Sequence, residues 1–146
     1  MNKANSLLEA LDELTWENYV EVAGAVTQFT IYGLDDAMKD QASVYSYYQG
    51  MLSMAKKRLD AAKLDLTKFS ATHRKEAKQR SSTKITAKDL DDLVESSDEF
   101  ADYNKEVNNA EFKYALLKGL CSALDQKKDM MVQLSSNRRA EMNLHK

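Results

Sequence analysis

Apolar residues recur at heptad spacing through the second quarter of the chain and beyond it. Steps of three and four residues from Ile31 trace a mostly apolar stripe that ends at Phe69. Its members are Ile31, Leu34, Met38, Gln41, Tyr45, Tyr48, Leu52, Ala55, Leu59, Ala62, Leu66 and Phe69. A helix keeps this spacing on one face, whereas a β-strand does not. The pattern therefore predicts one long helix over residues 31–80.

A second heptad stripe in the last third of the chain has a row of apolar residues beside it. The stripe contains Tyr103, Val107, Ala110, Tyr114, Leu117, Cys121, Leu124, Lys128 and Met131. The row beside it contains Leu116, Leu120, Ala123, Met130 and Leu134. This face is wider than one coiled-coil partner covers, so we expect two neighbours and consider another copy of the chain a candidate for one of them. Two long helices alone enclose little interior, which also favours a homo-oligomer.

The segment between the two stripes is polar. Residues 70–86 contain a single large apolar residue, so we interpret them as a mobile connection or a frayed helix end, with the break at residues 81–86. Thr86 and Asp89 have the spacing of a capping box with Asp in place of Glu, which predicts that a helix begins directly after Thr86. We expect this second long helix, or helix pair, over residues 87–142.

The first 30 residues form an N-terminal segment in this interpretation. Residues 6–14 have the spacing of a short amphipathic helix, whose apolar face contains Leu7, Leu8, Leu11 and Leu14. Residues 16–32 are ambiguous, because their β-branched residues suit a strand but an isolated strand would lack a partner. The whole pattern predicts an all-α fold: two long heptad-patterned helices in a hairpin, plus a short N-terminal helical segment.

Composition favours one domain over residues 1–146. The chain has no Pro and four Gly, so no obvious linker divides it. No run approaches the roughly 18 to 20 apolar residues of a membrane span, and the N-terminus lacks the apolar region and cleavage site of a secretion signal. The single Cys121 fits a reducing compartment. We therefore expect a cytoplasmic protein without a membrane partner.

Charge is sorted sharply along the chain. Residues 1–55 hold 2 Lys and Arg against 8 Asp and Glu, residues 56–88 hold 11 against 3, and residues 89–146 hold 8 against 12. The basic segment contains Lys56, Lys57, Arg58, Lys63, Lys68, Arg74, Lys75, Lys78, Arg80, Lys84 and Lys88. Such a segment between acidic arms indicates a local anion site, and a polyphosphate backbone is the ligand that we expect there.

Few side chains have the chemistry that catalysis requires. The chain has two His, one Cys and no Gly-rich phosphate loop or zinc-ligand spacing. We interpret His73 and His145 as solvated side chains and Cys121 as an inert core residue. The acidic run LDDLVESSDEFAD fits a metal site, a solvated helix start, or a face that contacts a basic partner or shields the basic segment. We expect no enzymatic activity, metal or cofactor.

Aromatic residues near the basic segment are candidates for stacking on nucleic-acid bases. Tyr45 and Tyr48 fall on the apolar stripe and are expected in the core, whereas Tyr47 falls off it and is the stronger stacking candidate. The cations flank the apolar seam, so they point outward while the helix packs. Nucleic acid is the favoured ligand of this face; a solubility role, an acidic protein and a membrane surface are the alternatives.

Four stretches, in this order, resemble the phage recombination mediators of the UvsY family. They are KKRLDAAK, the polar break, STKITAKDLDDL and YALLKGLCSALDQKKDMMVQLSSNRRAEM. That family carries a Lys-x-Arg-Leu element, usually followed by aromatic residues, that contacts DNA. Lys56, Arg58 and Leu59 match this element. Ala61 and Ala62 stand where the aromatic residues would be, which leaves electrostatics as the main source of affinity.

The resemblance implies a ring-like homo-oligomer that binds single-stranded DNA. It also implies that the protein helps to load a RecA-like recombinase onto strands covered by single-strand binding protein, in the host cytoplasm if phage-encoded. A basic ring can bend the strand and multiply weak contacts through avidity. The alternative is a structural or interaction coiled-coil phage protein, an assembly factor or inhibitor, whose basic face binds an acidic protein surface.

Overall fold

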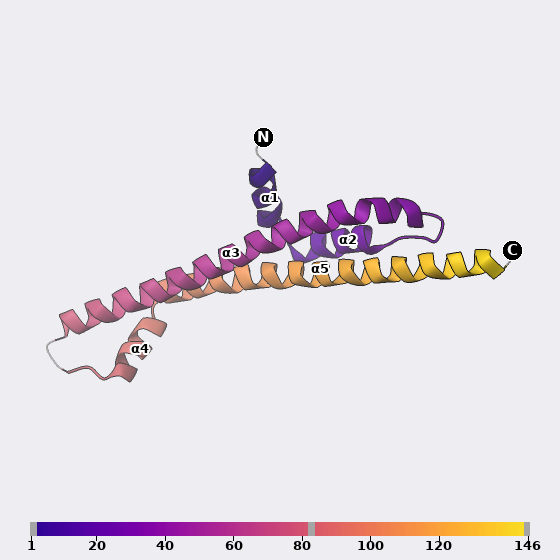
Figure 1. Ribbon diagram of the computed structural model, residues 1–146. Coiled ribbons are helices and arrows are strands. Elements are labelled where there is room, and N and C mark those ends of the chain that lie inside the picture. The colour runs from indigo at the N-terminus through magenta and orange to yellow at the C-terminus, as the bar shows by residue number, and fades with distance from the viewer. Residues whose placement is uncertain (1–2, 82–83, 145–146) are drawn as a thin grey trace. The chain divides into compact units, whose positions relative to one another are not determined.

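The described part of the chain is helical almost throughout. The computed structural model describes residues 3–81 and 84–144. The helices are α1 (Lys3–Asp12), α2 (Trp16–Thr27), α3 (Leu34–Arg80), α4 (Ala87–Glu95) and α5 (Asp98–Leu144) (Figure 1). Helix accounts for 89% of the structure, and the described residues contain no strand. The predicted all-α class is therefore confirmed.

Helix α2 occupies residues 16–27 of the ambiguous segment 16–32, and residues 28–32 are neither helix nor strand. The Thr15 hydroxyl accepts a hydrogen bond from the backbone N–H of Asn18 at 3.4 Å, and the Asn18 side chain accepts one from the Thr15 N–H at 2.8 Å. This reciprocal capping box satisfies two amides that a helix start leaves unpaired. The cap and the packing of α2 outweigh the weak strand preference of its β-branched residues. The short helix before it, α1, begins and ends a few residues earlier than predicted.

Helix α3 ends at Arg80, where the prediction of one long helix over residues 31–80 placed its end, and the interpretation of residues 70–80 as a mobile or frayed chain does not hold. The inner face of this part has aromatic partners. The Phe69 ring stacks on His73 with centroids 5.2 Å apart and packs on Tyr103 at 4.9 Å. These contacts stabilise residues 70–80 of α3, which have few apolar side chains of their own to bury. Positions 82 and 83 of the predicted break lie outside the described residues.

Helix α4 begins where the capping pattern predicts. The Thr86 hydroxyl accepts from the Asp89 N–H at 3.2 Å, and the Asp89 carboxylate accepts from the Thr86 N–H at 3.3 Å. Helix α4 ends at Glu95 and α5 begins at Asp98. Residues 87–142 are therefore a helix pair, one of the two arrangements that the sequence allowed.

Contacts group the described residues into two compact units, and both long helices contribute to each. Unit 1 comprises the described residues of Met1–Met54 and Ala115–Lys146, and unit 2 those of Ala55–Tyr114. The expectation of one domain over the whole chain stays a prediction.

In unit 1, the broad apolar face of α5 has a second neighbour from the same chain. Leu116 and Leu120 of the extra apolar row are buried. Helix α2 lies against this region, because Lys127 Nζ donates to the Val26 carbonyl at 2.7 Å and a β-carbon at Gly119 would lie 3.4 Å from the Tyr19 hydroxyl. Helix α2 is therefore one of the two neighbours that this face was expected to have, and the homo-oligomer stays a prediction.

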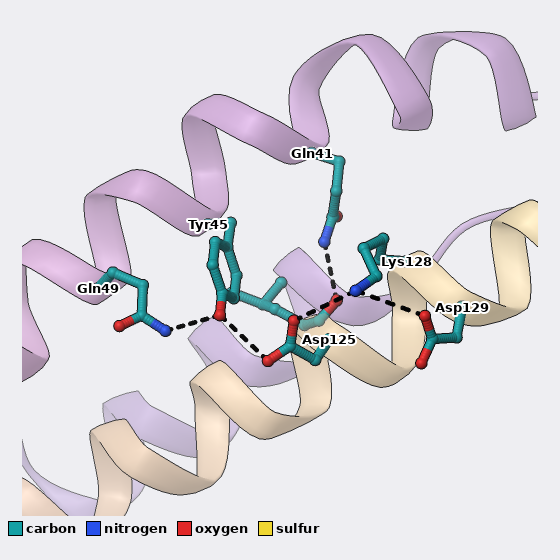
Figure 2. A network of polar contacts seen from close by, with 7 residues as sticks. Gln41, Tyr45, Gln49, Asp125, Lys128 and Asp129 are labelled. Atoms are coloured by element: carbon teal, nitrogen blue, oxygen red, sulfur yellow. Dashed lines mark hydrogen bonds and ion pairs between the residues drawn. The ribbon is translucent and has the colours of Figure 1, made fainter.

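A polar network crosses the heptad seam of unit 1 (Figure 2). Gln41 is 9% exposed and donates from Nε2 to the Leu124 carbonyl at 2.8 Å, while its Oε1 has no partner among the described residues. The Tyr45 hydroxyl donates to Asp125 at 3.1 Å and accepts from Gln49 at 2.8 Å. The bond that Tyr45 donates to Asp125, together with burial, favours the neutral phenol and raises the pKa of Tyr45, although the bond from Gln49 acts in the opposite direction. Buried polar groups at heptad positions restrict the register in which two helices can pack.

Candidate nucleic-acid interface

The basic part of α3 packs its apolar seam inside unit 2. Ala55 and Leu59 are almost fully buried, as are Leu90 and Val94 of α4 and Val107 of α5. At 100° per residue, the centre of this seam lies opposite the face that carries Lys57. The seam therefore fixes which cations face solvent and which lie beside neighbouring helices.

The cations at the edges of the seam are paired with carboxylates. Lys63 Nζ lies 3.5 Å from Glu111 of α5, and the Arg74 guanidinium lies 2.5 Å from Asp91 of α4. Arg80 lies 3.6 Å from Glu76, one turn away on α3. About half of each of the Lys63, Glu111, Arg74 and Asp91 side chains remains exposed. These pairs hold acidic helices against the basic helix, but they stay accessible to a competing anion.

The residues of the Lys-x-Arg-Leu element contact other residues of the same unit. Lys56 Nζ forms an ion pair with Asp60 at 2.8 Å and lies 5.8 Å from the centroid of the Tyr114 ring. The hydrogen bond to Asp60 and the charge of that carboxylate raise the pKa of Lys56. Arg58 is half-buried and interacts with other groups. Leu59 belongs to the buried seam. The element that carries the family resemblance is thus partly structural in this chain.

A second set of cations forms a row along the outer face of α3. Lys57, Lys68 and Lys75 fall within about 20° of one another on the helical wheel, and Lys78 lies about 60° to one side. All four are exposed, and none forms an ion pair with a described residue. At ~1.5 Å per residue, Lys57 and Lys68 are about 16 Å apart along the axis, and Lys68 and Lys75 about 10 Å. We call Lys57, Lys68, Lys75 and Lys78 the outer lysine row.

The remaining predicted cations lie beyond α3. Lys84 precedes α4 and Lys88 lies in its first turn, and both are exposed. They belong to the same unit as the outer lysine row.

Carboxylates offset most of the positive charge of unit 2. The range Ala55–Tyr114 contains 13 Lys and Arg against 12 Asp and Glu, a net charge of +1. The strongly basic block of the sequence therefore becomes a nearly neutral unit with a cationic outer row. Of the interpretations of the acidic run, shielding of the basic segment matches the ion pair of Asp91 with Arg74.

The aromatic residues divide between the two units. Tyr47 is 44% exposed, as its position off the stripe predicted, and it meets Tyr48 edge-on with centroids 5.0 Å apart. Tyr47 belongs to unit 1, whereas the outer lysine row belongs to unit 2. The Phe69 ring packs against His73 and Tyr103 rather than standing free to stack on a base. Unit 2 itself contains an exposed aromatic residue, Phe112 of α5, which is 46% exposed.

The described residues carry little chemistry beyond charge. They contain no cluster of three or more His, Cys, Asp or Glu that suits a metal ion. Cys121 is buried, and burial raises the pKa of its thiol, as expected for a core residue. His73 is not the solvated side chain that was predicted, since it is half-buried against Phe69; His145 lies outside the described residues. None of the helices in the described ranges combines the length and apolarity of a membrane span.

Comparison of this chain with protein-family models, curated proteins and solved structures finds no match. The residues themselves are therefore the basis for a functional proposal.

Part of this interface can be predicted from the sequence, and part cannot. Helical periodicity within α3 separates the outer lysine row from the residues of the seam, because a single helix fixes the direction of every side chain. The acidic partners Asp91 and Glu111 are distant in sequence, and their pairing was not predicted. The signal that pointed toward them is the order of the charge blocks, because a basic helix followed by an acidic one can pair after the chain folds back.

Proposed function

We propose that this protein binds single-stranded DNA through the outer face of α3 in unit 2. The observation that carries the proposal is the outer lysine row, which is exposed and free of ion pairs with the described residues. Ammonium groups on flexible stems suit phosphates at variable spacing, and they need no base-specific geometry. Lys56, Lys63 and Arg74 flank the row and supply further cations when a polyanion displaces their carboxylates.

The role that best accounts for this face is that of a recombination mediator. In this proposal, two long helices in a hairpin assemble into a ring-like homo-oligomer that presents repeated lysine rows to one strand. Repetition multiplies weak contacts, and a bent strand is less accessible to single-strand binding protein and is ordered for a RecA-like recombinase. The protein acts by binding alone, without catalysis, in the cytoplasm of a phage-infected host.

A second candidate is an interaction protein whose lysine row contacts an acidic protein surface, such as a phage assembly factor or inhibitor. The net charge of only +1 in unit 2 favours this candidate, because weak long-range attraction suits a local protein contact better than capture of a long polyanion. Nucleic-acid binding distinguishes the two candidates.

The test is fluorescence anisotropy with a labelled oligonucleotide, single-stranded against double-stranded, at salt concentrations between 50 and 200 mM. Each phosphate neutralised on a single strand contributes about −0.7 to the slope of log affinity against log salt. The four row lysines on one protomer therefore give a slope near −2.8, and a larger assembly gives a steeper one. Light scattering on the same sample measures the oligomer mass. Absence of binding at 50 mM salt would reject the proposal in favour of the interaction protein.

A further inference from the structure

An open apolar hollow lies among α1, α2, α3 and α5 in unit 1. Its volume is about 160 Å³, comparable to the ~150 Å³ engineered cavity that accommodates benzene. Leu14, Val22, Met51 and Leu117 supply aliphatic lining, and Tyr19, Tyr47 and Tyr48 supply aromatic lining. The hollow thus has room for one large apolar side chain.

Trp16 of α2 extends this surface through its contact with the lining residue Tyr19. Trp16 is 54% exposed, and its ring stacks on that of Tyr19 with centroids 5.7 Å apart. Val20, one turn further along α2, is 52% exposed, and no residue of α2 is fully buried. Exposed aromatic and aliphatic residues beside a hollow are typical of surfaces that dock another chain.

The α1 and α2 side of the hollow is acidic. Residues 4–27 contain five Asp and Glu and no Lys, Arg or His, while on the α5 side the exposed Lys118 follows the lining residue Leu117. Glu13 lines the hollow, and Glu17 lies next to Trp16 in the first turn of α2. The backbone hydrogen bond at this helix start and a second one from Thr15 lower the pKa of Glu17, which therefore stays ionised near neutral pH. A partner with a cationic rim around its apolar anchor would match both features.

We propose that this hollow docks a basic segment of a different protein, with one large apolar side chain seated between Tyr19, Tyr47 and Leu117 and Lys or Arg residues facing Glu13 and Glu17. The surface belongs to unit 1 and shares no residue with the outer lysine row. Partner docking and DNA binding therefore use separate surfaces and can fail separately.

Trp16 is the single Trp of the chain and reports directly on this surface. The probe is the synthetic peptide KRKFKRK, titrated into the intact protein while Trp16 emission is recorded, with KRKAKRK as the matched peptide. We expect the Phe peptide to shift the emission saturably and to bind at least tenfold more tightly than the Ala peptide. Equal affinities, or no shift, would overturn the proposal. An emission shift with protein concentration alone would mean that a second copy fills the hollow, which also overturns it.

Two variants test separately how the apolar lining and the carboxylates contribute to peptide binding. Ala10→Leu adds apolar volume to the lining of the hollow, and it should reduce the preference for the Phe peptide at least fivefold. Glu13→Gln with Glu17→Gln should weaken both peptides alike. The control is Asp35→Asn with Asp36→Asn, which removes the same charge from exposed positions in the first turn of α3. If the control weakens the peptides as much as the Glu13 and Glu17 pair does, the cationic peptide is not held at the hollow. Circular dichroism checks that every variant keeps its helices.

Discussion

Releasing the paired cations of unit 2 should strengthen DNA binding. The double variant Asp91→Asn with Glu111→Gln removes the carboxylate partners of Arg74 and Lys63. Both pairs are about half exposed, and exposed ion pairs of this kind contribute ~0.2 to 1 kcal/mol each. If a strand must displace both carboxylates, their removal saves about 0.4 to 2 kcal/mol, which is roughly a 2- to 30-fold gain in affinity.

The salt dependence gives a second, independent number. If the strand already displaces both carboxylates in the parent protein, the slope of log affinity against log salt should stay the same, and if the two cations reach phosphates only in the variant, the slope should steepen by about 1.4. The assay is anisotropy with a labelled oligothymidine at 50, 100 and 200 mM salt. The matched control is Asp102→Asn with Glu106→Gln, which removes two exposed carboxylates of α5 that form no ion pair among the described residues. An equal gain in the control would show a general charge effect, and an unchanged affinity in the test variant would refute the competition between carboxylates and phosphates.

Three predictions concern the scaffold. Thr86→Ala removes the cap of α4 and should lower the free energy of unfolding by ~1 kcal/mol in urea titrations; no change would mean that the Asp89 side chain suffices. Gln41→Met removes the buried, unpartnered Oε1 together with one hydrogen bond, and it should raise the free energy of unfolding by about 1 kcal/mol; a loss would show that the bond to Leu124 dominates. Burial and the raised pKa of Cys121 should make its thiol react with a maleimide at pH 7 far more slowly than the denatured chain does; equal rates would contradict its placement.

Much of the helical layout could be predicted because it depends on local patterns. Heptad spacing identified Ala55 and Leu59 as core residues, and both are almost fully buried. The hydroxyl and carboxylate spacing of Thr86 and Asp89 located the start of α4, since a capping box involves residues three apart. Ile31 is 61% exposed although it continues the stripe, because it precedes the first residue of α3.

The features that the sequence did not predict depend on contacts between distant residues. The polar end of α3 is helical because Phe69 and His73 find Tyr103 on another helix. Part of the second row of α5 lies beside α2, whose helical state was itself ambiguous in the sequence. The pairing of Arg74 with Asp91 likewise needs the fold. Composition identified the basic segment but did not separate its outer lysines from its paired cations.

The outer lysine row is the central claim, and one comparison tests it most directly. Lys57→Gln, Lys68→Gln and Lys75→Gln together keep good helix formers on an exposed face, so the fold should persist. The control carries Lys39→Gln, Lys105→Gln and Lys118→Gln, an equal change in charge at exposed positions outside the row. The measurement is the salt slope of single-stranded DNA binding by anisotropy. The account predicts that the row variant loses about 2 from the magnitude of the slope and most of its affinity at 100 mM salt, while the control stays close to the parent protein. Equal slopes for the row variant and the parent protein would contradict the assignment of DNA binding to this face.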